Sequence, residues 1–135
     1  MLVEQITQLP IYSPLRYKSR MNLFRSKAKP DADGYFTTVA IDAVQADQMT
    51  AISINRHKII LTTWDGTLYA FSAECPHASA DFSKGWVSRY KVTCPDHQYC
   101  WDLRNGRILW PDDENYRLKM YPVKVEDGIV KVKIG

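Results

Sequence analysis

Two short segments of the chain each hold one cysteine and one histidine close together. In Cys75–His77 a single proline separates them, and in Cys94–His97 a proline and an aspartate do. Thiolates suit iron–sulfur clusters, zinc and copper(I), whereas imidazoles suit zinc, copper, iron and nickel. Two donors of each kind therefore indicate a metal site. Its candidate ligands are Cys75, His77, Cys94 and His97.

The spacing of these donors bears on the choice of metal. Structural zinc accepts two cysteines and two histidines, but it usually pairs ligands of one type, as Cys-x2–4-Cys and His-x3–5-His. Here each segment offers one ligand of each type, and only Pro76 lies between Cys75 and His77. A zinc-stabilised binding module is therefore the less favoured alternative.

The elements that must position these donors are strand-like. β-branched and aromatic residues, which favour strands, are concentrated in residues 35–41, 49–54 and 57–64. Asp-Gly or Asn-Gly pairs, which favour the positive-φ turns of hairpins, follow at positions 65–66, 105–106 and 127–128. The last of these pairs lies between strand-like runs at 119–125 and 129–134. Only residues 42–48 could be helical. We predict an all-β fold of small antiparallel sheets, packed as a sandwich or barrel.

Both Cys/His segments follow strand-like runs, at residues 68–71 and 91–93. Each is therefore expected on a loop held by rigid strands, where functional residues are often found. Pro76 and Pro95 directly follow the two cysteines and stiffen these loops by fixing φ.

Length and composition indicate one soluble domain. The chain has 135 residues, of which 45% are hydrophobic and 24% charged. Residues 1–34 show neither helical nor strand periodicity, and residues 16–29 are basic without any acid. We expect residues 1–34 to form an irregular basic extension and residues 35–135 to form the domain, with metal-binding loops at about 74–110.

The cysteine count and the charge restrict compartment and partners. If two of the three cysteines bind metal, Cys100 is left as a thiol, which favours a reducing compartment. We find no apolar run long enough to cross a bilayer and no secretory signal, so we expect a cytoplasmic protein without a transmembrane segment. A net charge of +3 is too small to indicate nucleic acid.

Residues 35–134 resemble the Rieske family, in which two histidines replace two cysteines on one iron of a 2Fe-2S cluster. The resemblance is carried by the motifs at Cys75–Gly85 and Cys94–Gly106. It implies that the two cysteines bind the inner iron and the two histidines bind the outer one. It also implies a base of antiparallel sheets in a sandwich, carrying a smaller cluster-binding subdomain.

The chain departs from the family pattern at two loop positions. Family members commonly have glycine directly after the second histidine and two residues after the first, where this chain has Gln98 and Ser79. Glycine permits positive φ without steric cost, so we expect the local backbone to differ there.

Other positions indicate the subgroup. Ala80 and Asp96 stand where high-potential members have a disulfide, and Tyr99 and Trp101 stand where those members have a serine and a tyrosine that donate hydrogen bonds to cluster sulfurs. We therefore expect a potential near the low end of the Rieske range of about −150 to +300 mV. Trp101, together with Trp86, is a candidate to shield the cluster from water.

Low-potential single-domain members are commonly soluble Rieske ferredoxins. The resemblance implies a monomeric one-electron carrier between a flavin-dependent reductase and an oxygenase, and not an enzyme in its own right. The alternative is a Rieske subunit bound within a multisubunit oxidoreductase such as a nitrite reductase.

Overall fold

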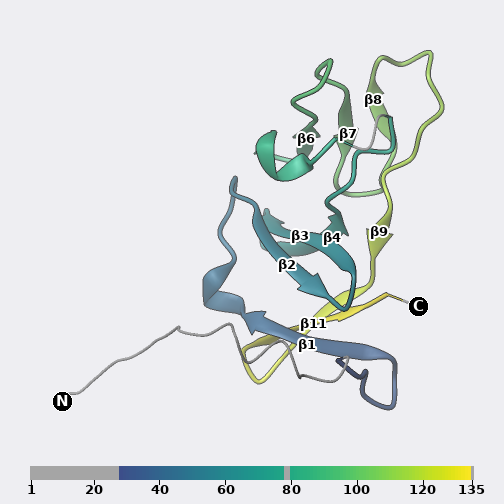
Figure 1. Ribbon diagram of the computed structural model, residues 1–135. Coiled ribbons are helices and arrows are strands. Elements are labelled where there is room, and N and C mark those ends of the chain that lie inside the picture. Colours follow the sequence, from purple (N-terminus) through teal and green to yellow (C-terminus); the bar gives the residue numbers. More distant parts are fainter. Residues whose placement is uncertain (1–27, 78–79, 135) are drawn as a thin grey trace.

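The computed structural model describes residues 28–77 and 80–134, and these form three antiparallel sheets (Figure 1). The first sheet has the order β1-β11-β10, with bounds Tyr35–Ala40, Ile129–Lys133 and Val123–Glu126. The second has the order β2-β3-β4-β9, with bounds Thr50–Ile54, His57–Trp64, Thr67–Ser72 and Met120–Tyr121. The third has the order β5-β6-β7-β8, with bounds Trp86–Ser88, Lys91–Thr93, Cys100–Asp102 and Ile108–Trp110.

The β2-β3-β4-β9 sheet lies between the other two and is buried on both faces. In β3, Ile59 and Leu61 pack with Phe36 and Val132 of the first sheet, whereas Ile60 packs with the residues around the two cysteines. Neighbouring residues of a strand point to opposite faces, so a continuous apolar run serves two cores. The predicted base and smaller subdomain are confirmed, with β5–β8 forming the subdomain (Figure 1).

Two of the three predicted hairpin turns have the expected backbone. Asp65 and Gly66 have φ of 53° and 77°, and Asp127 and Gly128 have φ of 52° and 76°. At the third, Gly106 has a positive φ of 76°, but its N–H donates to the carbonyl of Asp102, which makes a longer loop.

Some predicted elements differ in extent. The strand-like run at 119–125 is divided into β9 and β10 at Pro122, which has no N–H to donate to a ladder. The possible helix at 42–48 is only the 3-10 turn η2 (Ile41–Ala43), and a second 3-10 turn, η3 (Phe82–Lys84), lies between the two Cys/His segments. Within residues 28–77 and 80–134, no helix is long and apolar enough to span a membrane.

Candidate metal centre

The two Cys/His segments lie on loops of the same design. The backbone N–H of Cys75 donates to the carbonyl of Ala80, and that of Cys94 donates to the carbonyl of Tyr99, both at 2.8 Å. Each cysteine thus begins a six-residue loop that one backbone hydrogen bond closes. The first loop follows β4 and the second joins β6 to β7.

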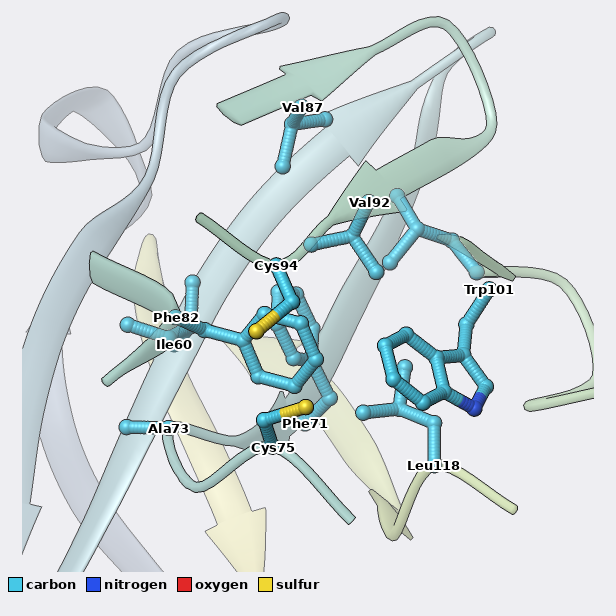
Figure 2. Packing of buried hydrophobic residues seen from close by; sticks show 11 residues of the cluster. Ile60, Phe71, Ala73, Cys75, Phe82, Val87, Val92, Cys94, Trp101 and Leu118 are labelled. Atoms are coloured by element: carbon cyan, nitrogen blue, oxygen red, sulfur yellow. The ribbon is translucent and has the colours of Figure 1, made fainter. Parts of the chain in front are cut away.

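The two thiols meet in the core beneath the loops. Cys75 and Cys94 are 1% and 0% exposed, and Figure 2 shows their sulfur atoms turned toward the same interior space beside Phe82. Burial, together with the neighbouring Cys75, raises the pKa of the Cys94 thiol to about 11. A thiol that ligates metal must lose its proton, so metal binding here releases protons. The Sγ atom of Cys94 also accepts a hydrogen bond from the backbone N–H of Asp96, at 3.4 Å.

The two imidazoles lie close together and are less buried than the thiols. The rings of His77 and His97 lie edge to face, with centroids 5.5 Å apart. The Nδ1 atom of His77 is buried and has no hydrogen-bond partner among the described residues. A buried unpaired nitrogen is costly, and a metal ion would satisfy it. The donors therefore fit a group that takes sulfur at its inner end and nitrogen at its outer end.

The donors are arranged as pairs. Among the residues that the structure describes, no three His, Cys, Asp or Glu side chains gather closely enough to hold a single ion. A Rieske cluster takes two cysteines on one iron and two histidines on the other.

Aromatic side chains hold His77 from one side. The ring of Tyr99 stacks on it, with centroids 3.8 Å apart and planes 16° from parallel, and Tyr116 meets its edge at 5.8 Å. The Tyr99 hydroxyl donates a hydrogen bond of 3.0 Å to Glu114. This packing was not predicted from the sequence. The only indication in the sequence is the concentration of aromatic residues around the second loop.

The second loop is shaped by its backbone. His97 and Gln98 both have positive φ, 67° and 59°, a conformation that favours glycine. At Gln98 a non-glycine residue thus adopts a left-handed conformation that glycine takes without steric cost. The corresponding position in the first loop, Ser79, lies outside the described residues.

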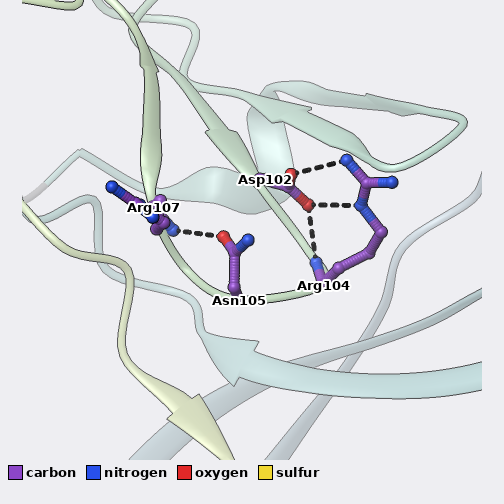
Figure 3. Close-up of polar contacts among 4 residues, drawn as sticks. All are labelled: Asp102, Arg104, Asn105 and Arg107. Carbon is purple, nitrogen blue, oxygen red and sulfur yellow. Dashed lines mark hydrogen bonds and ion pairs between the residues drawn. The ribbon is translucent and has the colours of Figure 1, made fainter.

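A hairpin behind the second loop is anchored by a buried carboxylate. Asp102 is 4% exposed, and Figure 3 shows its oxygens accepting hydrogen bonds from the backbone N–H and the guanidinium of Arg104. These bonds hold the pKa of Asp102 below its usual range. The same guanidinium lies 3.9 Å from the ring centroid of Tyr90, in the turn between β5 and β6. The Arg104 side chain thus joins the two hairpins of the subdomain, by an ion pair within one and a cation–π contact to the other.

Other residues identified in the sequence take different positions. All three cysteines lie among the described residues and are free thiols, and burial raises the pKa of Cys100. Trp101 is fully buried in the core around the thiols, whereas Trp86 is 46% exposed and is not part of that core.

The paired donors on two loops of an antiparallel β-fold define a class of protein. Residues 35–122 of the chain match the Rieske [2Fe-2S] domain family. The chain therefore belongs to the Rieske family, and its cofactor is a Rieske 2Fe-2S cluster.

Relatives of known function cover most of the chain. This chain is 29% identical over 102 residues to the ferredoxin component of the naphthalene 1,2-dioxygenase system of Pseudomonas putida. The alignment covers 75% of this chain and 96% of the relative. The chain is 33% identical over 97 residues to the anthranilate 1,2-dioxygenase ferredoxin subunit of Burkholderia cepacia, spanning 71% and 88%.

A solved structure has the same fold. The ferredoxin of carbazole 1,9a-dioxygenase from Nocardioides aromaticivorans superposes with a TM-score of 0.67 at 21% identity, covering 75% of this chain and 98% of that one.

Proposed function

We propose that the protein is a one-electron carrier that takes electrons from a reductase and delivers them to an oxygenase. The observation that carries this proposal is the buried thiol pair with an imidazole pair outside it, in a Rieske fold. The relatives named above are ferredoxin components of dioxygenase systems. Electron transfer, and not catalysis by this chain alone, is the activity that these features support.

The ligand assignment is part of the proposal. Cys75 and Cys94 would bind the inner iron, and His77 and His97 the outer one. The bound cluster accepts and releases one electron at a time. The protein excludes water from the sulfur end by burying both cysteines, and it brings the nitrogen end to the surface through His97, whose side chain is 68% exposed.

We also propose a potential near the low end of the Rieske range of about −150 to +300 mV. Hydrogen bonds to cluster sulfurs raise the potential. The hydroxyl of Tyr99 is directed to Glu114 instead, which supports the low value.

The boundaries and the setting of the protein are proposals of the same kind. We propose that the protein is a monomer. We also propose that it works in the cytoplasm, and the unpaired thiol of Cys100 supports this location. We propose that residues 1–34 are an extension, in keeping with the start of β1 at Tyr35. The basic residues 16–27 lie outside the described part of the chain.

The test is chemical and spectroscopic. Purified protein should contain equal iron and acid-labile sulfide, and the reduced protein should give a Rieske-type electron paramagnetic resonance spectrum. A potentiometric titration should give a negative midpoint, and NADH with a flavoprotein reductase should reduce the protein. Zinc without iron or sulfide would overturn the proposal, and co-purification with large subunits would favour a resident subunit over a free carrier.

A further inference from the structure

An exposed aromatic face lies beside the proposed ligand His77. It consists of Trp110, Tyr116 and Tyr99. Trp110 is 57% exposed and Tyr116 is 39% exposed. Their ring centroids lie 6.3 Å and 6.2 Å from the ring centroid of Tyr99, and the Tyr99 ring stacks on His77. Aromatic rings thus form a continuous path from the surface to a proposed ligand, and exposed apolar groups of this size commonly mark interaction sites.

The same face carries negative charge. The segment between Trp110 and Tyr116 reads Pro-Asp-Asp-Glu-Asn, and both aspartates are exposed. The Tyr99 hydroxyl donates a hydrogen bond of 3.0 Å to the carboxylate of Glu114, so one of these negative charges lies against the aromatic face itself. The neighbouring Arg117 is directed away, to the carbonyl of Asn105 at 3.5 Å. This local charge is opposite to the net charge of the chain, which is +3.

We propose that the aromatic face docks a redox protein whose own surface presents basic residues around an apolar recess that accepts Trp110. This inference rests on the proposed electron-carrier function. Opposite charges on the two faces would steer the encounter, and the exposed side chain of Trp110, seated in the recess of the partner, would supply most of the binding energy. The aromatic path through Tyr99 would then lead the electron from His77 to the partner.

Ferricytochrome c, a basic redox protein, serves as the probe, and ferricyanide serves as its anionic counterpart. In either reaction the reduced protein loses one electron and the acceptor iron goes from ferric to ferrous, without any bond being made or broken. Stopped-flow rates are measured at low and at high ionic strength. The rate with cytochrome c should fall at least about threefold as salt screens the attraction. A protein acting through its net charge of +3 would show the opposite dependence.

Two pairs of variants with equal charge change localise the effect. Asp112→Asn/Asp113→Asn should lower the rate of cytochrome c reduction about threefold at low salt and should not lower the rate of ferricyanide reduction. The control, Asp65→Asn/Asp127→Asn, alters two exposed aspartates in hairpin turns of the base and should leave both rates unchanged.

The apolar part of the face is tested in the same way. Trp110→Ser should lower the rate of cytochrome c reduction about tenfold. The control, Trp86→Ser, removes an exposed tryptophan at the opposite edge of the same sheet and should have no effect. Tyr116→Ser should act in the same direction as Trp110→Ser, and the resonance spectrum shows whether each variant retains its cluster.

The outcomes separate the two proposals. The docking face would be overturned if the rate of cytochrome c reduction did not depend on salt, or if it responded equally to both aspartate pairs. Normal rates of ferricyanide reduction in the same experiments would still support the electron-carrier function. None of these surface variants should lose the 2Fe-2S resonance signal. A wild-type protein that gives no 2Fe-2S signal would overturn the carrier function and the docking face with it.

Discussion

Cys75 and Cys94 are equally buried and begin loops of equal length, but the histidines that follow them are held in different ways. His77 is stacked on Tyr99 and has a buried Nδ1 atom. The side chain of His97 is 68% exposed, and its closest charged group is Asp96 at 3.4 Å. Side-chain packing from elsewhere in the chain thus positions the first imidazole, whereas the backbone of its own loop positions the second.

The inner and outer ends of the site therefore differ in symmetry, although each end has two donors of the same type. Its inner end is symmetric because both sulfurs share one apolar core. Its outer end is asymmetric because Tyr99, a residue of the second loop, covers the histidine of the first. The two loops therefore depend on each other, although each is closed by its own backbone hydrogen bond.

The largest expected effect comes from removing either imidazole. His77→Gly and His97→Gly should both lose the Rieske resonance signal, because each takes away a proposed ligand. Excess free imidazole should restore the signal only in His97→Gly, where the space left by the side chain is open to solvent. Equal rescue of both variants would contradict the difference in burial.

The second loop should be more sensitive to its packing than an ordinary turn. A Cβ atom at Gly85 would lie 2.1 Å from the carbonyl oxygen of Thr93 and 3.1 Å from Cδ of Pro95. Gly85→Ala should therefore lower the free energy of unfolding by about 3 kcal/mol, measured by urea denaturation. Gly66→Ala, which has positive φ and no atom within 4 Å, should cost only about 1 kcal/mol.

Acid should weaken the hairpin behind the second loop. The pKa of Asp102 is lowered by its hydrogen bonds with Arg104. Its contribution to stability is therefore present above the unfolded-state value of about 3.9 and is lost as pH falls through the lower folded-state value. Asp102→Asn should be less stable than the wild type at neutral pH, and the gap should close below about pH 4. A gap that is constant with pH would show that the carboxylate charge contributes nothing.

The packing on His77 can be divided into two parts. Tyr99→Phe keeps the ring and loses the hydrogen bond to Glu114, which should cost about 1 kcal/mol in unfolding free energy. Tyr99→Leu also loses the stacked ring and should cost a further 1 kcal/mol or so, about the value of an aromatic pair. If the two variants were equally stable, the stacking on His77 would have no energetic role.

The smallest expected effect has the opposite sign. Gln98 has a φ of 59°, so Gln98→Gly should relieve left-handed strain and raise the stability by about 0.5 kcal/mol. Thermal unfolding measures this gain, and Gln48→Gly, at an exposed loop position without positive φ, should show none.

Much of the base was predictable because its signals are local. Residues 57–64 form β3 as predicted, and the Asp-Gly turns at 65–66 and 127–128 have the positive φ that such pairs favour. The run at 119–125 was predicted as one strand, and Pro122 divides it. The strand Trp86–Ser88 was not predicted, although the equally short strand Lys91–Thr93 was.

The site was predictable in part. The four donors could be named from their types and spacing, since these are written in two short segments. The stacking of Tyr99 on His77 could not be predicted, because it joins two loops separated by many residues. The exposure of Trp86 and the burial of Trp101 likewise depend on which face of the subdomain meets the base.

The pairing order of the strands has a consequence for synthesis of the chain. The subdomain strands β5–β8 pair only with their sequence neighbours, so its hairpins can form as soon as they leave the ribosome. Among the strands that the structure describes, β1 pairs only with β11, the last of them to be made. Of these strands β1 must therefore wait longest for its partner, and until then its open edge is exposed to pairing with another molecule.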